Sequence, residues 1–227
     1  MRPRAVFFDL DDTLIDRAGA FARYVDSLVS RHPAAFPVAR RAEAVAWLHA
    51  VDGRGGTARS AFCEQVTEAF PGLGLTPEAL WEDLATHLPR LVQEDAGVCD
   101  WVADVVRSRP VAVVSNGSAR VQRTKLARAG LADVLTEVFL SGEVGASKPD
   151  ARIFEAALAH VGREPEEVLH VGDDPERDVV GAAKLGLATC WVSHGRPWPS
   201  ALPPPTFTVE CIPSRLDDIA GVLTRWT

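Results

Sequence analysis

The sequence predicts an α/β protein in which a parallel β-sheet is covered by helices on both faces and is interrupted by one helical insertion. The apolar run at residues 5–8 lacks the alternation of a strand with one wet face. A long stretch of helical periodicity follows it. From Gly97 onward strand-like and helix-like segments alternate, which is typical of βαβ units.

The elements of the insertion follow from apolar residues at three- and four-residue steps. This spacing predicts a first helix that ends before Pro33. The later helices are separated by segments rich in glycine and proline. The helices are expected at residues 21–29, 38–51, 58–70 and 77–91, the last after a Thr76-Pro77 cap signal. The insertion is therefore expected to be a helical bundle.

In the remainder of the chain, apolar runs bounded by turn residues predict strands, and periodic segments between them predict helices. Strands are expected at residues 111–114, 138–141, 168–174, 188–192 and 207–212. Helices are expected at residues 98–108, 119–129, 151–161, 181–185 and 216–223, with a proline-rich loop at residues 196–205.

Composition excludes several classes of protein. A formal charge of −7 over 227 residues argues against a nucleic-acid or anionic-membrane partner. No apolar run reaches membrane-spanning length and the start of the chain lacks a signal-peptide pattern, so a cytoplasmic location is expected. The four cysteines are far apart in the sequence and lack zinc-ligand spacing, so we expect them to be reduced.

The first predicted strand ends in carboxylates. Asp9 and Asp11 share a face if the backbone stays extended, and about 4 Å apart they would repel by about 4 kcal/mol at an effective dielectric near 20. Such a pair needs a cation, a shared proton or a partner base, and Mg²⁺ is the simplest answer. A solvated acidic turn or a helix N-cap is the alternative. A calcium loop is excluded, because Leu14 and Ala20 stand where it needs Gly and Glu.

Polar side chains follow other predicted strands as well, and ligands in open α/β sheets bind beyond the carboxyl ends of the strands. Taken singly, each has an ordinary explanation as a helix cap, a turn or a surface lysine. Taken together, their order and placement indicate one site. The residues are Ser115, Asn116, Lys148, Asp173, Asp174 and Asp178.

These motifs resemble those of the haloacid dehalogenase-like hydrolase superfamily. The matching residues are Asp9-Leu-Asp11-Asp-Thr13, Ser115-Asn116-Gly117, Lys148-Pro149 and Gly172-Asp173-Asp174 with Asp178. The resemblance implies a three-layer Rossmann-like core at residues 1–16 and 96–227, with a helical cap at residues 17–95. The run from Ser115 to Phe154 further resembles the branch with nucleotidases and N-acylneuraminate-9-phosphate phosphatase.

The resemblance also implies roles for the two acids of the first motif. Asp9 would be the nucleophile that forms an aspartyl-phosphate, and Asp11 would be first the general acid and then the base. Mg²⁺ would be held by Asp9, the backbone carbonyl of Asp11 and Asp173. Thr13 would shape the turn and support Asp9 through a hydrogen bond.

The later motifs would bind and neutralise the phosphoryl group. Ser115 and Asn116 would hold phosphoryl oxygens, and Lys148 would neutralise developing charge. Asp178 would orient Lys148 or a metal-bound water. For Asp174, a metal contact and a helix cap fit equally well.

The expected activity is magnesium-dependent hydrolysis of a small phosphorylated metabolite. A phosphomutase of the same superfamily and a non-catalytic binding protein on the same fold are alternatives. A 2-haloacid dehalogenase is disfavoured because family dehalogenases lack a carboxylate at the position of Asp11. The sequence does not name the substrate, and it does not distinguish a monomer from a homodimer.

Overall fold

A computed structural model describes residues 3–210 and 221–223. The chain divides into two compact units, one formed by Met1–Asp16 with Gln93–Thr227 and the other by Arg17–Val92. The second unit is thus an insertion that follows the first strand. That it acts as a cap stays a prediction.

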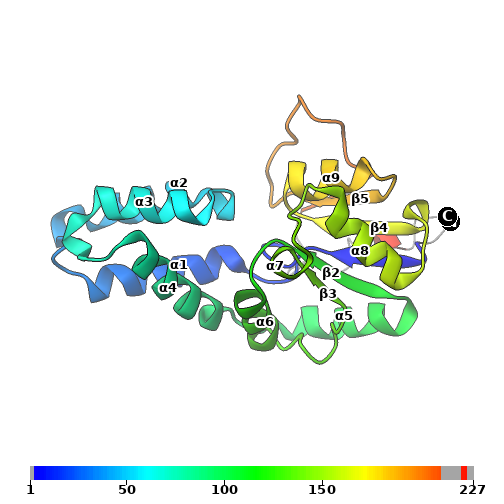
Figure 1. The fold of residues 1–227 in the computed structure, drawn as a ribbon, viewed down its shortest axis with the longest axis horizontal. Helices are drawn as coiled ribbons and strands as arrows, with labels where there is room; N and C mark the ends of the chain where they lie inside the picture. The colour runs from blue at the N-terminus through cyan, green and yellow to red at the C-terminus, as the bar shows by residue number, and fades with distance from the viewer. Residues whose placement is uncertain (1–2, 211–220, 224–227) are drawn as a thin grey trace. The chain divides into compact units, whose positions relative to one another are not determined.

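The first unit is built on a six-stranded parallel sheet (Figure 1), which confirms the predicted fold class. The strand order β3-β2-β1-β4-β5-β6 places the first strand in the middle of the sheet. The strands are β1 (Ala5–Phe8), β2 (Val111–Ser115), β3 (Val138–Leu140), β4 (Val168–Gly172), β5 (Ala188–Val192) and β6 (Phe207–Val209).

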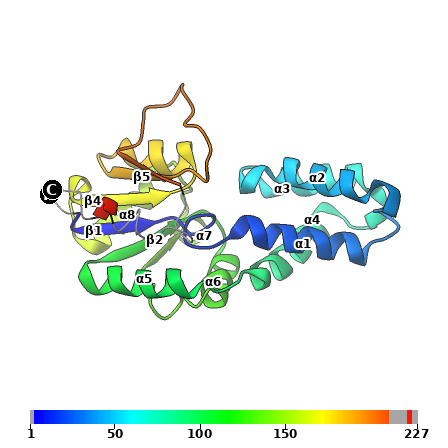
Figure 2. The same cartoon turned by 180° about the vertical axis from the view of Figure 1, so that it is seen from behind.

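Both faces of β1 are buried, as its uninterrupted apolar run predicts. Successive side chains of a strand point to opposite faces, and Phe7 and Phe8 are each 0% exposed. Phe7 belongs to a core cluster with Phe154 of α8 (Ala151–Val161). The ring of Phe8 lies 5.6 Å from that of Trp101 in α5 (Ala96–Ser108). Figures 1 and 2 show α5 and α6 on one side of the sheet and α8 and α9 on the other.

The remaining helices of this unit are short. They include α6 (Ala119–Arg128), α7 (Ser141–Val144), the 3₁₀ helix Pro165–Glu167, the π-helix Pro175–Val180 and α9 (Gly181–Ala183). Neither α7 nor the π-helix was predicted, because four to six residues are too few to show a helical period. The predicted strand at residues 168–174 ends at Gly172, since Asp174 caps the π-helix that follows.

The second unit contains the predicted helices with shifted ends. They are α1 (Arg17–Arg31), α2 (Arg41–Asp52), α3 (Arg59–Ala69) and α4 (Pro77–His87). A 3₁₀ turn, Leu88–Leu91, replaces the expected last turn of α4 because Pro89 lacks the N–H that an α-helix needs. The helices enclose a separate core that includes Phe21, Tyr24, Leu48 and Phe62.

Two predicted elements lie partly outside the described residues. The last strand is observed as far as Val209, and residues 211–212 of the prediction are not described. Of the predicted terminal helix at residues 216–223, only residues 221–223 are described, and they are helical. Within the described part of the chain, no helix has the length and apolar character needed to cross a membrane.

Candidate active site

The predicted site residues of the first unit meet at one edge of its sheet. β1 lies between β2 and β4, and all three strands are parallel. Asp9 follows β1, Ser115 ends β2, and Asp173 follows β4. The carboxyl ends of parallel strands share one edge, so the topology alone brings these side chains together.

Lys148 joins two carboxylates in the interior of this site. Its Nζ donates to Asp9 Oδ1 and to Asp178 Oδ1, each at 2.6 Å, and the lysine side chain is 2% exposed. Burial raises the pKa of Asp9 to about 7, although Lys148 opposes the shift. Burial would lower the pKa of Lys148, but Asp178 and Asp9 outweigh it and hold the ammonium charged.

The carboxylate of Asp178 has three hydrogen-bond donors around it. Its Oδ1 accepts from Lys148 and lies 3.1 Å from His170 Nε2, and its Oδ2 accepts from the backbone N–H of Asp174 at 3.0 Å. Burial alone would raise the pKa of Asp178, but Lys148 and His170 hold it below its usual range. Gly172 permits this arrangement, because a Cβ there would collide with the Asp178 carboxylate.

Asp173 completes an acidic cluster. One carboxylate oxygen from each of Asp9, Asp173 and Asp178 lies within 4.8 Å of the others. Burial, followed by the charges of Asp178, Asp9 and Asp12, raises the pKa of Asp173 to about 8. Arg196 opposes this shift, and its Nη2 donates to Asp173 Oδ2 at 3.0 Å.

Asp11 binds different partners from Asp9. Lys125 Nζ lies 2.7 Å from both carboxylate oxygens of Asp11, and Gln122 Nε2 donates to Oδ2 at 3.1 Å. Both partners come from α6 and are 2% or less exposed. The sequence offered three ways to hold Asp9 and Asp11 close together: a cation, a shared proton or a partner base. Lys125 and Lys148 are such partner bases, one for each carboxylate.

The two polar residues after β2 differ in what they contact. Gln122 Nε2 donates to Ser115 Oγ at 2.8 Å. The side chain of Asn116 clamps the backbone of Lys148, since its Nδ2 donates to the Lys148 carbonyl at 3.0 Å and its Oδ1 accepts from the Lys148 N–H at 2.8 Å. In this structure the Asn116 side chain thus positions the backbone of Lys148, and its predicted contact with a phosphoryl oxygen stays a prediction.

The supporting residues of the first and last motifs shape turns. Asp12 has a φ of 53°, a left-handed conformation that aspartate tolerates better than most residues. Thr13 Oγ1 is buried and makes no hydrogen bond within the described residues, so the expected support of Asp9 is not seen. Asp174 caps the π-helix by accepting from the N–H groups of Glu176 and Arg177, which is one of the two roles expected for it.

Sequence reasoning missed Gln122, Lys125, His170 and Arg196. Gln122 and Lys125 are three residues apart on α6, so they share one helix face. That spacing was visible, but lysine and glutamine on a helix are usually solvated. His170 lies inside an apolar strand, and Arg196 lies in the loop after β5. Neither residue belongs to a sequence pattern that indicates a functional site.

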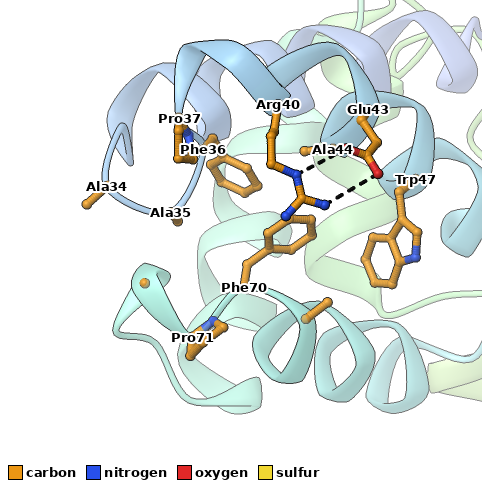
Figure 3. A pocket seen from close by; sticks show the side chains of 12 residues that line it. Ala34, Ala35, Phe36, Pro37, Arg40, Glu43, Ala44, Trp47, Phe70 and Pro71 are labelled. Carbon is orange, nitrogen blue, oxygen red and sulfur yellow. Dashed lines mark hydrogen bonds and ion pairs between the residues drawn. The ribbon is translucent and has the colours of Figure 1, made fainter.

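The helical unit has a cavity of its own, with a volume of about 370 Å³ (Figure 3). Phe36, Trp47 and Phe70 line it, and the Phe70 ring lies 4.8 Å from Phe36 and 5.3 Å from Trp47. An Arg40–Glu43 ion pair stands beside these rings. The volume suits a small molecule, but none of the predicted site residues lines this cavity.

Comparison with known proteins gives one family. Residues 3–186 match the model of the haloacid dehalogenase-like hydrolases. The phosphoserine phosphatase of Thermus thermophilus is 46% identical over 89 residues, which is 39% of this chain and only 36% of that protein. The human N-acylneuraminate-9-phosphatase is 27% identical over 220 residues, covering 85% of this chain and 83% of that protein.

A solved structure shares the fold along nearly the whole chain. It is the HAD-hydrolase YfnB from Bacillus subtilis, whose crystal structure is bound to magnesium. The TM-score is 0.80 at 21% sequence identity, covering 98% of this chain and 99% of that one. The resemblance in the motifs and the relatives among phosphatases confirm the superfamily that the sequence indicated.

Proposed function

This chain belongs to the haloacid dehalogenase-like hydrolases, and from that premise we propose that it hydrolyses a small phosphate monoester with the help of Mg²⁺. The observation that carries the proposal is the Asp9–Lys148–Asp178 arrangement with Asp173 beside it. It combines a buried carboxylate, a fixed ammonium and a further acid at one sheet edge.

The acidic cluster fits a hard divalent cation. Carboxylate oxygens are the ligands that Mg²⁺ prefers, and oxygens from three aspartates lie within 4.8 Å of one another. The raised pKa of Asp173, about 8, reflects burial and repulsion from neighbouring carboxylates that a dication would relieve. Asp9, Asp173 and the backbone carbonyl of Asp11 would hold the ion. When bound, Mg²⁺ would neutralise these acids and polarise a phosphoryl oxygen.

Asp9 is the proposed nucleophile. Lys148 binds its Oδ1, while Oδ2 makes no hydrogen bond to the described residues and is the oxygen that can attack phosphorus. Attack by Oδ2 forms the O–P bond of an aspartyl-phosphate as the bond to the leaving oxygen breaks. Lys148 favours the ionised form of Asp9 and opposes the effect of burial, which raises the pKa of that carboxyl to about 7.

Asp11 is the proposed acid and base. In the structure its carboxylate is paired with Lys125, which stabilises the ionised form that can accept a proton from the hydrolytic water. For the first half reaction Asp11 needs a proton. An arriving phosphate adds negative charge nearby and so favours the protonated carboxyl group. The two half reactions thus use two protonation states of one side chain.

Ser115 is the proposed phosphate-binding hydroxyl. Its Oγ accepts from Gln122, so its own hydrogen is left to donate to a phosphoryl oxygen. Asn116 contributes by fixing the backbone of Lys148 on both sides of the peptide unit. Lys148 then presents a positive charge where charge develops in the transfer.

The test is release of inorganic phosphate from p-nitrophenyl phosphate, with and without Mg²⁺. The wild type is expected to turn over only with the metal, and Asp9→Asn is expected to abolish turnover because an amide is a poor nucleophile. Asp133→Asn is a matched control, since Asp133 is exposed in the same unit. Equal rates for the wild type and Asp9→Asn would refute the assignment of Asp9.

Substrate class and reaction type are resolved by a second experiment. We propose to incubate the enzyme with phosphorylated sugars, nucleotides and short organic acids and to identify the products. Free phosphate as the main product supports a phosphatase, whereas an isomeric phosphate would show a mutase. Release of halide from 2-haloacids without phosphatase activity would overturn the proposal.

A further inference from the structure

His170 lies beneath the site and contacts it through one atom. It sits on β4, where it pairs with Phe7 of β1, and its side chain is 0% exposed. Its Nε2 is 3.1 Å from Asp178 Oδ1, the oxygen that also binds Lys148. An ionised carboxylate can only accept, so Nε2 carries the hydrogen and donates it to Asp178.

Packing alone does not account for a histidine at this position. With the hydrogen on Nε2, the other ring nitrogen is an acceptor, and Nδ1 has no hydrogen-bond partner within the described residues. The ring packs edge-on against Phe154 at 5.1 Å, a contact that an apolar ring would also make. A buried acceptor without a partner is costly, so packing alone would favour an apolar side chain at this position.

The contact with Asp178 supplies what an apolar side chain cannot. Three donors surround the Asp178 carboxylate: Lys148 Nζ, His170 Nε2 and the backbone N–H of Asp174. Without the imidazole, only the lysine and one backbone group would orient the carboxylate. The lysine is the group that should be held still, because it also binds Asp9 at 2.6 Å.

We infer that His170 is a positioning residue, which orients Asp178 and through it fixes the Lys148 ammonium on the nucleophile Asp9. Within the described residues its ring makes no hydrogen bond to Asp9 or Asp173, and the hydrogen bond to Asp178 is the contact through which it positions Lys148. The inference rests on the proposed phosphatase function, because it gives Lys148 a task in that reaction.

The experiment compares His170→Phe, His170→Leu and His170→Gln with the wild type at saturating Mg²⁺ and p-nitrophenyl phosphate. Phenylalanine keeps a ring against Phe154 but removes the donor, and leucine removes both the ring and the donor while staying apolar. Glutamine places an N–H the same number of bonds from Cβ as Nε2 of histidine. The readouts are kcat, KM and the melting temperature.

We expect His170→Phe and His170→Leu to lower kcat by about tenfold, since small misplacements of a reacting group are costly, with KM within about twofold. Their melting temperatures report stability separately from kcat, because these variants remove the unsatisfied Nδ1 but also one donor to the buried Asp178 carboxylate. His170→Gln should recover kcat to within about threefold of the wild type. Unchanged kcat in both apolar variants, or a glutamine variant as slow as they are, would overturn the inference.

A second readout does not depend on activity. Buried lysine ammonium groups exchange hydrogen slowly and give NMR signals, and Lys148→Met assigns the Lys148 signal by its loss. Faster exchange of the Lys148 ammonium in the apolar variants, but not in His170→Gln, supports positioning by the N–H. Equal exchange in all variants overturns it. If the wild type shows no phosphatase activity, the proposed function fails, and this measurement still decides the role of His170.

Discussion

Replacing Lys148 by methionine tests the charge balance of the site most directly. Methionine has a similar length but removes the ammonium that lies 2.6 Å from both Asp9 Oδ1 and Asp178 Oδ1. All three side chains are at most 9% exposed. Removing one partner of a buried ion pair typically costs about 3–5 kcal/mol of unfolding free energy. We expect a loss of this size when both carboxyl groups are ionised.

The size of this loss should depend on pH. The pKa of Asp9 is raised to about 7 by burial, with Lys148 acting in the lowering direction, so Lys148→Met should raise it further. Below about pH 7 Asp9 carries a proton in both proteins. Between that pH and the new pKa, only the variant is protonated, and the difference in stability should grow with pH by about 1.4 kcal/mol per unit. The loss at pH 9 should thus exceed that at pH 7 by up to about 3 kcal/mol.

The assay is urea unfolding in EDTA at pH 7 and pH 9, followed by tryptophan fluorescence. Lys184→Met is the matched control, since Lys184 is an exposed lysine of the same unit. It should leave the unfolding free energy unchanged at both pH values. A Lys148→Met variant as stable as this control, or one whose loss does not grow with pH, would refute the account of the ion pairs.

Two further predictions concern the metal and the helical unit. Asp9 and Asp173, with pKa values raised to about 7 and about 8, are ionised only at higher pH, so Mg²⁺ should raise the melting temperature more at pH 8.5 than at pH 6. Equal shifts in differential scanning fluorimetry would contradict this. Arg17→Met should destabilise the chain by about 3–5 kcal/mol in urea unfolding, because Arg17 and Asp52 form a buried pair with two contacts of 2.5 Å. The exposed Arg40, replaced in the same way, should have little effect, and similar losses for both variants would contradict the prediction.

The sheet could be predicted because the sequence patterns that indicate its strands lie within short segments of the chain. The apolar run before Asp9 and the alternation of strands and helices after Gly97 are visible within short windows of sequence. Parallel topology then brings Asp9, Ser115 and Asp173 to one edge without further information. Element ends were less accurate, as at Pro89, because a few residues of 3₁₀ or π geometry leave no period to read.

The partners inside the site could not be predicted in the same way. Lys125 lies on a helix where a lysine is ordinarily solvated, and its pairing with Asp11 spans more than one hundred residues of sequence. The side-chain amide of Asn116 also binds a backbone group 32 residues away, a contact that the sequence did not indicate. Such contacts depend on how loops and helices approach one another in space. The spacing of residues along the chain does not show that approach.

The two hydrogen bonds from Asn116 fix the backbone of the loop at residue 148 without contacting the side chain that carries the charge. Both hydrogen bonds join Asn116 to main-chain atoms of residue 148, so any amino acid with a backbone N–H could be bound there equally well. A relative that had exchanged its lysine for a neutral residue would therefore keep the same main-chain path while losing its charge. Overlaid backbones would then look alike whether or not the protein could still perform chemistry.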